Sequence, residues 1–312
     1  MMQETMTPNA QSSALKVAVG FDTHTDPRRA SIAAAEIARA GLCGGTPQLA
    51  LIITAGDNAN DPVPCVRSVL GPVGVAGGST TGIFTDSGLF GRGVLVVAFA
   101  TEGDAASGAA CVTAPDLADA GRRAARLVMA GWPFRLRYPR GLGLAFTSSG
   151  SPLPFLESWR QFMGPKMRTV CGVMPGRMVC GTETQQAMAS VACLEASYAT
   201  GLGFADGFTA DTWPDAGALV HGTAEATKTA LKRLDERSAR LVLVFESAAR
   251  YEALGALARD EWSAVQAEVA DRAPCVGWLC DRVSGYGRGI QPADQHGALI
   301  VAAVGDPPAV TA

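Results

Sequence analysis

The sequence predicts a mixed α/β fold of two pseudo-repeated halves stacked around a shared core, an αββα-like arrangement with mixed sheets inside and helices outside. Three observations favour this fold. Apolar strand-like runs alternate with Ala-rich amphipathic stretches. The runs at 94–100 and 241–245 are apolar throughout, as in strands covered on both faces. The element order near the N-terminus also recurs near the C-terminus, and neither half has enough strands to bury a core alone.

The first half shows strand and helix signals in turn. Strand-like alternation at 15–21 follows a polar leader at 1–14, which we expect to be disordered. Asp26 is typical of a helix N-cap and Pro27 of the first helical position, so we expect a helix that ends at Gly41. A second, shorter helix is expected between Asp61 and Gly71. The remaining strands are expected at 48–54, 73–78 and 93–101.

The second half repeats this order. A strand at 240–245, a helix at 250–272 interrupted near Gly255, a strand at 275–280 and a last strand at 297–304 are expected. The glycine-rich stretches around Gly201-Leu202-Gly203 and Gly285-Tyr286-Gly287 are expected to be turns. We place the boundary between the two modules after residue 206, which gives modules at 15–206 and 207–312.

The stretch between the two repeats carries weaker signals. Helices are expected at 114–130, 154–163 and 223–237, and strands at 142–147 and 167–173. The pattern at 182–197 fits a helix or a strand.

Composition excludes several classes of protein. Hydrophobic residues make up 48% and charged residues 18% of the chain, so we expect a folded protein. The net charge of −3 gives no basic footprint for nucleic acid. The apolar runs are too short to span a bilayer, and the polar N-terminus does not resemble an export signal. We therefore expect a cytoplasmic protein without membrane insertion.

Cysteine and histidine patterns offer no metal motif. The eight cysteines form no CxxC pair and are expected to be free thiols in a reducing compartment. Cys275 and Cys280 are expected on opposite faces of one strand. The three histidines, His24, His221 and His296, are too far apart in sequence for a local zinc site. No metal is expected.

Polar residues at strand ends are the candidate ligand-binding positions, because α/β folds place their ligand crevice there. Ser79, Thr80, Thr81 and Gly82 follow the strand at 73–78, and an ordinary hydroxyl-capped turn is the alternative interpretation. Ser247 and Arg250 follow the strand at 241–245, where a surface salt bridge is the alternative. A mobile loop containing Arg282 and Tyr286 is expected to close on the ligand, with an ordinary surface loop as its alternative. These groups are expected around one cleft.

Catalytic signatures are weak. Thr81 stands where a GxSxG nucleophile motif needs glycine, and no lysine follows a glycine as a Walker A loop requires. Cys280 and Ser79 are the remaining candidates for a nucleophile. A reactive Cys280 would need a nearby cation such as Arg282 or Arg288 to stabilise its thiolate.

Glycine-containing motifs recur in the same order in both halves of the chain. The N-terminal module carries VGFDTHTD, PQLALIITAG, VAGGSTTG and GVLVVAF at about 17–101. The C-terminal module carries ARLVLVFESAAR, PCVGWLCDRVSGYGRG and HGALIVAAV at about 217–304. These motifs and their order resemble the FIST (F-box and intracellular signal transduction) domain. Where the family has Cys-x-x-Arg, this chain keeps Arg250 but has Ser247 in place of the cysteine.

The resemblance implies a sensory, signal-transducing module that binds a small ligand and acts through a partner protein supplied in trans. It also raises heme-binding gas sensing as an alternative, for which the three histidines are the candidate axial ligands. A cysteine- or serine-dependent enzyme on the same scaffold is the second alternative.

Overall fold

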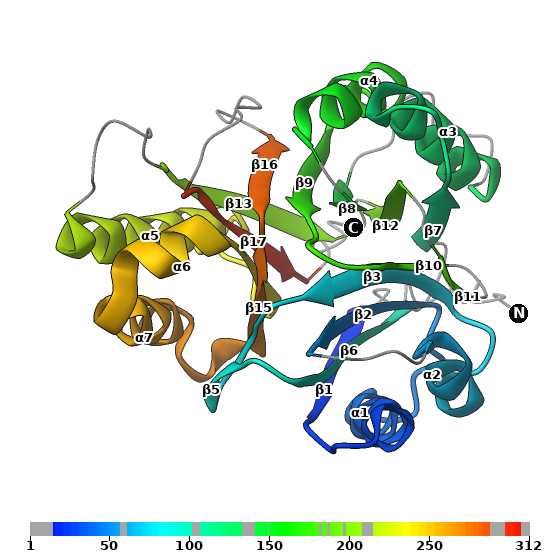
Figure 1. The fold of residues 1–312 in the computed structure, drawn as a ribbon, viewed down its shortest axis with the longest axis horizontal. Helices are drawn as coiled ribbons and strands as arrows, with labels where there is room; N and C mark the ends of the chain where they lie inside the picture. Colours follow the sequence, from blue (N-terminus) through cyan, green and yellow to red (C-terminus); the bar gives the residue numbers. More distant parts are fainter. Residues whose placement is uncertain are drawn as a thin grey trace, which may run out of the picture.

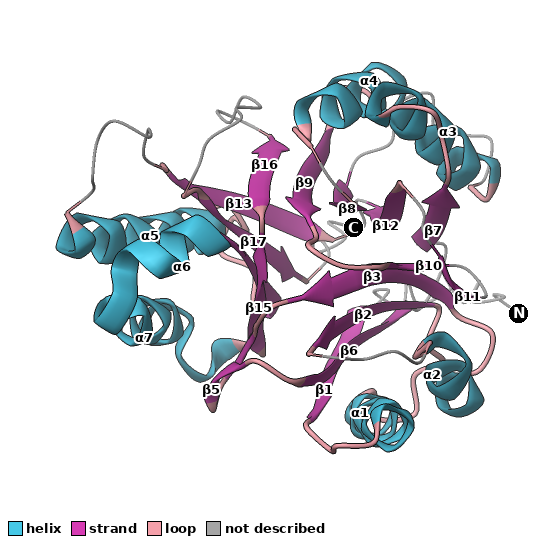
Figure 2. Cartoon of the chain, viewed as in Figure 1, coloured by secondary structure: helices cyan, strands magenta, loops and turns pink. Residues whose placement is uncertain are grey.

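Three β-sheets lie inside the molecule, and the helices cover their outer faces (Figure 1, Figure 2). The structure, a computed structural model, describes residues 15–56, 61–101, 107–132, 141–148, 150–180, 183–185, 188–195, 198–207, 215–287 and 297–306. The expected mixed α/β architecture is confirmed. The expected leader at 1–14 lies outside the described residues.

The chain forms three units of one element order. The first unit contains β1 (Leu15–Asp22), α1 (Pro27–Gly41), β2 (Leu49–Ala55), α2 (Val63–Leu70), β3 (Gly74–Thr80), β4 (Ile83–Thr85), β5 (Gly88–Phe90) and β6 (Gly93–Thr101). The second contains β7 (Ser107–Val112), α3 (Leu117–Ala130), β8 (Gly141–Thr147), α4 (Leu153–Met163), β9 (Met167–Val173), β10 (Met178–Cys180), β11 (Glu183–Gln185) and β12 (Ala189–Glu195). The third contains β13 (Ala199–Ala205), α5 (Ala216–Lys232), β14 (Ala239–Ser247), α6 (Ala248–Leu254), η1 (Gly255–Leu257), α7 (Ala258–Val269), η2 (Ala270–Arg272), β15 (Cys275–Cys280), β16 (Arg282–Tyr286) and β17 (Leu299–Gly305).

The two repeats recognised in the sequence are the first and third of these units, and the second unit is a further copy between them. The three lobes are separate in Figure 1, with α1 and α2, α3 and α4, and α5 to α7 on their outer sides. The expected module boundary after residue 206 follows β13, and β13 pairs with β17 of the third unit. The ambiguous stretch at 182–197 contains the strands β11 and β12.

Each unit arranges its strands in the same way. The strand orders are β1-β6-β2-β3, β7-β12-β8-β9 and β13-β17-β14-β15. Within each unit, the second and third strands along the chain pair in parallel: β2 with β3, β8 with β9 and β14 with β15. The last strand pairs antiparallel with the first two.

An additional strand from each unit completes the sheet of another unit. Strand β10 of the second unit pairs with β3 of the first, and β16 of the third pairs with β9 of the second. Strand β4 of the first unit pairs with β15 of the third, which closes the cycle. Every sheet is therefore built from two units.

The inner faces of the three sheets meet in one core. It contains Ile53 of the first unit, Phe146 of the second, and Phe245 and Trp278 of the third, all buried. The ring centroids of Phe245 and Trp278 lie 4.5 Å apart, and those of Phe146 and Phe245 lie 6.0 Å apart. The expected shared core is confirmed.

Aspartates begin the three helices that follow the first strand of each unit. Asp26 accepts a hydrogen bond from the backbone N–H of Arg28, Asp116 from that of Asp119, and Asp215 from that of Gly217. Asp215 starts α5 at Ala216, earlier than the expected residue 223. None of the described helices is both long and apolar enough to cross a membrane.

The glycines of β13 do not form the expected turn. A Cβ on Gly203 would lie 1.7 Å from the backbone oxygen of Ala226, and one on Gly201 would lie 1.9 Å from that of Ala230. Glycine is needed here because the backbone of α5 rests directly on the strand. The expectation of a turn was wrong because it took glycine as a sign of a bend.

Strand β16 replaces the expected mobile loop at Arg282 to Tyr286. Val283 pairs with Gly172 and Gly285 with Val170 of β9. A Cβ on Gly285 would lie 2.7 Å from the backbone oxygen of Thr169, so glycine again permits close approach. The loop prediction is corrected to a strand held in the second unit's sheet.

Candidate functional site

The turn at Ser79 to Gly82 uses its hydroxyls within the protein. The Thr80 hydroxyl lies 2.5 Å from the backbone oxygen of Leu279 and accepts from the backbone N–H of Gly82 at 3.2 Å. Ser79 shares a 2.9 Å hydrogen bond with the Thr54 hydroxyl. Thr80 and Gly82 are buried, whereas Thr81 is exposed. These contacts attach β3 of the first unit to β15 of the third.

Ser247 and Arg282 lie close to that turn. Ser247 is aligned with Cys280 across the parallel pair β14 and β15, next to Leu279. The Ser247 hydroxyl donates to the backbone oxygen of Asp281 at 3.4 Å, directly before Arg282. These contacts place the ends of β3, β14 and β15 close together.

Arg250 lies inside the third unit. Its side chain is fully buried, and its Nε donates to Glu261 at 2.8 Å. The remaining acceptors are the Thr223 hydroxyl and the backbone oxygens of Asp206, Leu219 and Gly297. The expectations that Arg250 faces the Ser79 turn, or forms a surface salt bridge, are corrected: the guanidinium holds α5, α6 and α7 together.

The cysteines are mostly buried. Cys111 is disulfide-bonded, which corrects the expectation that all eight are free thiols. Cys280 is fully buried with its Sγ 3.9 Å from the Met174 sulfur, and this burial raises the pKa of its thiol well above the ordinary value. A nucleophilic cysteine needs its thiolate, so this environment opposes catalysis by Cys280. Cys275 and Cys280 belong to different core clusters on opposite faces of β15, as expected.

The histidines are dispersed. His24 is exposed in its turn, where its Nδ1 accepts from the backbone N–H of Asp26 at 3.0 Å. His221 is exposed on α5, and His296 and Arg288 lie outside the described residues. Within the described ranges, no group of three or more His, Cys, Asp or Glu side chains is placed to hold a metal ion.

A cationic pocket lies where the second and third units meet, and we call it the seam pocket. Its volume is about 560 Å³. It is bordered by Gly141 at the start of β8, Tyr198 and Thr200 at the start of β13, and Gly287 after β16. Among the described lining residues, one carries a carboxylate, Asp235, and five are cationic: Arg160, Lys166, Arg168, Arg233 and Arg237.

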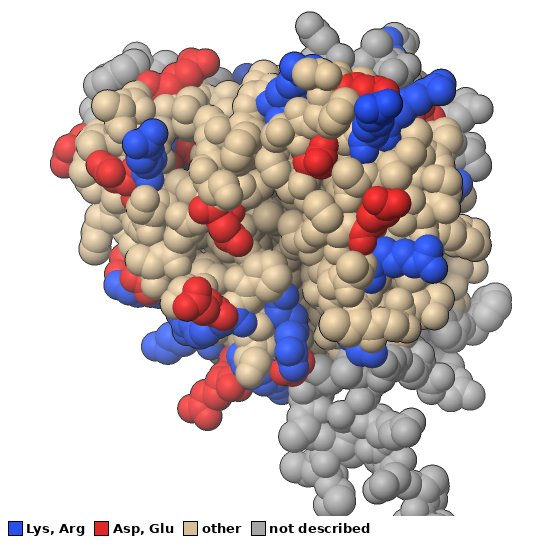
Figure 3. Space-filling model, turned by 90° about the horizontal axis from the view of Figure 1, so that it is seen from below, with Lys and Arg blue, Asp and Glu red and all other residues tan. Residues whose placement is uncertain are grey.

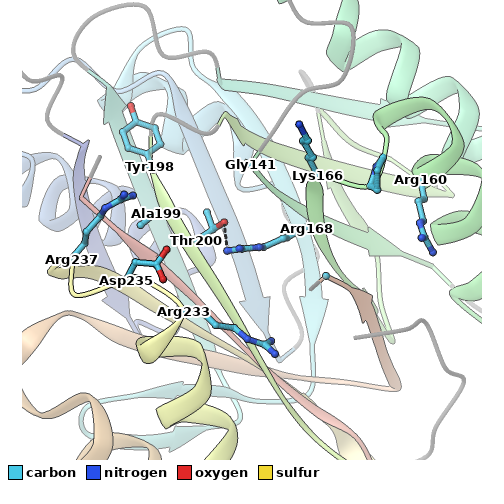
Figure 4. A pocket seen from close by; sticks show the side chains of 12 residues that line it. Gly141, Arg160, Lys166, Arg168, Tyr198, Ala199, Thr200, Arg233, Asp235 and Arg237 are labelled. Carbon is cyan, nitrogen blue, oxygen red and sulfur yellow. Dashed lines mark hydrogen bonds between the residues drawn. The ribbon is translucent and has the colours of Figure 1, made fainter. Parts of the chain in front are cut away.

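Side-chain contacts hold three of the five cations in place (Figure 4). Arg168 on β9 donates to the Thr200 hydroxyl of β13 at 3.0 Å, which connects the two units at the pocket. Arg233 donates to the backbone oxygen of Leu202 at 2.5 Å. The Arg160 guanidinium lies 5.5 Å from the ring centre of Tyr286, an arrangement typical of a cation–π contact.

Tyr286 therefore contacts a residue of the pocket lining without being part of that lining. Its ring is 3% exposed, and burial raises the pKa of its phenol to about 12. Of the ligand-binding residues predicted from the sequence, Tyr286 lies nearest to the pocket lining. It is followed by Gly287, which lines the pocket itself.

This arrangement is suited to anions. Guanidinium groups hold phosphate and carboxylate through paired N–H donors, and a lysine adds a mobile point charge. The concentration of positive charge contrasts with the face in Figure 3, where acidic and basic side chains are interspersed. The sequence did not single out these cations because they come from α4, the connection to β9, β9 itself and the segment after α5.

Comparisons with known proteins identify no relative by sequence: no family model and no curated protein matches the chain. Among solved structures, a cyanuric acid hydrolase from A. caulinodans aligns with 95% of this chain and 100% of its own, at 10% identity and a TM-score of 0.48. Another cyanuric acid hydrolase aligns with 93% and 99%, at 10% identity and a TM-score of 0.43. PurLQS from Thermotoga maritima aligns with 96% and 75%, at 11% identity and a TM-score of 0.28.

Proposed function

We propose that the chain is a FIST-type sensory protein of the cytoplasm that binds a small anionic molecule in the seam pocket and passes the signal to a partner protein. The observation that supports this proposal is the set of five cationic side chains around one cavity between two units. The pocket volume of about 560 Å³ lies in the range of small-molecule sites.

The lining favours binding over chemistry. Its guanidinium and ammonium groups attract and orient negative charge, and the Thr200 hydroxyl is already a hydrogen-bond acceptor for Arg168. The nucleophile candidates Cys280 and Ser79 lie elsewhere: Cys280 is buried, and Ser79 is paired with the Thr54 hydroxyl. We therefore prefer ligand sensing to the cysteine- or serine-dependent enzyme.

Thermal unfolding in the presence of inorganic phosphate tests the site. Lys166 and Arg237 stand on different units, and within the described structure neither side chain makes a hydrogen bond or ion pair that the substitution would remove. Removing both as Lys166→Ala and Arg237→Ala should leave the unliganded Tm unchanged. Phosphate should raise the Tm of the wild type and raise that of the double variant less.

A matched control is Arg29→Ala, because the Arg29 side chain is 74% exposed on α1, away from the seam. It removes one positive charge and should respond to phosphate as the wild type does. A phosphate response that is equal in the wild type and the double variant would place anion binding outside the seam pocket.

Heme titration tests the alternative cofactor. His24 and His221 are exposed at separate places in the structure, and the seam pocket carries no histidine among its described residues. We expect no stoichiometric Soret band after heme addition. A band that disappears with His24→Ala, His221→Ala or His296→Ala would instead support the heme-binding gas sensor.

A further inference from the structure

The threefold repeat creates three equivalent seams. At each one, the first strand of a unit lies beside the start of the parallel strand pair of the preceding unit. Strand β7 contacts β2 and β3, β13 contacts β8, and β1 contacts β14. The start of β9 reaches β13 through the Arg168–Thr200 hydrogen bond, and β1 and the start of β15 line one cavity. The seams can therefore be compared as three versions of one structural position.

The three seams differ in shape and charge. Between the first and second units, small residues meet: a Cβ on Gly74 would lie 3.3 Å from the Cβ of Ala109. Between the third and first units, a cavity of about 820 Å³ is lined by apolar residues such as Val17, Phe21 and Val276, with few charges. The cationic lining between the second and third units is therefore a property of that seam and does not follow from the fold.

The cations of the seam pocket stand on two walls. Arg160, Lys166 and Arg168 belong to the second unit. Arg233 and Arg237 follow α5 in the third unit. In Figure 4, Lys166 and Arg160 lie to one side of Thr200, and Arg237 lies to the other. A ligand with negative charge at both ends would meet cations of both units, and Asp235 is the one carboxylate among the described lining residues.

The third unit's wall is held in a strained conformation. Asp235 and Glu236 have φ angles of +52° and +64°, which non-glycine residues rarely adopt. With Leu234, these two residues form the segment between Arg233 and Arg237. Strained backbone of this kind clusters at binding sites, where the surrounding structure maintains it.

We infer that the ligand of the seam pocket carries two anionic groups, one held by each wall, and that its binding clamps the second unit to the third. This inference rests on the proposed function and specifies its ligand class: a molecule with two linked phosphoryl or carboxylate groups. The Arg168–Thr200 hydrogen bond already crosses the seam, and the ligand would add charge-assisted contacts on both sides of it.

Isothermal titration with four probes at one ionic strength tests this inference: inorganic pyrophosphate, orthophosphate, succinate and acetate. We expect a two-group probe to bind at least about tenfold more tightly than the one-group probe of the same chemistry. The pyrophosphate and succinate arms distinguish a phosphorylated ligand from a dicarboxylate. Either Lys166→Ala or Arg237→Ala should remove most of this preference, and Arg29→Ala should retain it.

The outcomes separate the two proposals. If one-group and two-group probes bind equally in the pocket, the clamp is wrong and the anion-binding function stands. If a two-group preference persists in both single-wall variants, two-wall recognition is wrong. If none of the four probes binds the wild type, both the clamp and the anionic ligand of the proposed function are wrong.

Discussion

The buried carboxyl pair beside Arg250 predicts an unusual dependence of stability on pH. Glu246 and Glu261 are 3% and 2% exposed, and the Arg250 Nε donates to Glu261 at 2.8 Å. Burial raises the pKa of Glu246 well above its ordinary value, and the neighbouring charge of Glu261 adds to this effect. Glu246 is therefore protonated in the folded protein at pH values where the unfolded chain has lost that proton.

The sign and size of the effect follow from proton linkage. The proton stabilises the folded protein fully at pH values below the pKa that Glu246 has in the unfolded chain. This stabilisation is lost as the pH rises through the pKa that Glu246 has in the folded protein. Between the two values the folded state holds one more proton, so the free energy of unfolding falls by about 1.4 kcal/mol per pH unit. Glu246→Gln, which is neutral at every pH, should remove this slope.

Urea unfolding followed by tryptophan fluorescence between pH 5 and pH 7 measures the difference. Over this interval the free energy of unfolding should fall more steeply with pH for the wild type than for Glu246→Gln. The exposed Glu252→Gln is the matched control and should follow the wild type. Parallel stability curves for the wild type and Glu246→Gln would refute the assignment of a retained proton to Glu246.

Two further predictions concern packing and thiol accessibility. Gly203→Ala places a Cβ against the backbone of α5, so we expect the free energy of unfolding measured in urea to fall by about 1–3 kcal/mol. Gly217→Ala is the control: its Cβ would have the Asp215 carboxylate as its nearest neighbour, at 3.6 Å, so this loss should not occur. In the folded protein, iodoacetamide should label Cys43 and Cys65 before the four buried free cysteines. Mass spectrometry would measure the order of labelling, and early labelling of Cys280 would contradict its burial.

The strands of the first and third units were predictable because their apolar runs are continuous. Strands β2 and β6 are buried along their whole length, so nearly every residue is apolar. Strands β13 and β16 were missed because their glycines serve close backbone approach, which a single sequence does not distinguish from a turn. The second unit was not recognised as a repeat because its individual elements carried no shared motif.

The candidate site was predictable only in part. Polar residues at strand ends, such as Thr80 and Ser247, do come together, because the parallel pairs end at the same side of the core. The seam pocket depends instead on which units become neighbours. Lys166 and Arg237 line one pocket because the second and third units are neighbours, and no local pattern encodes that arrangement.

The cyclic strand exchange also constrains how the chain can fold during synthesis. The free edge of strand β3 in the first unit is paired only after β10 has been made, and the β4–β5 hairpin joins its sheet only after β15 has left the ribosome. The first unit must therefore keep a sheet edge unpaired while most of the chain is made, and unpaired edges promote aggregation. Contacts this distant in sequence also slow folding. The third unit, which is synthesised last, thus completes the exchange of strands among the three units. A nascent chain that stops before β15 lacks strands of the third sheet.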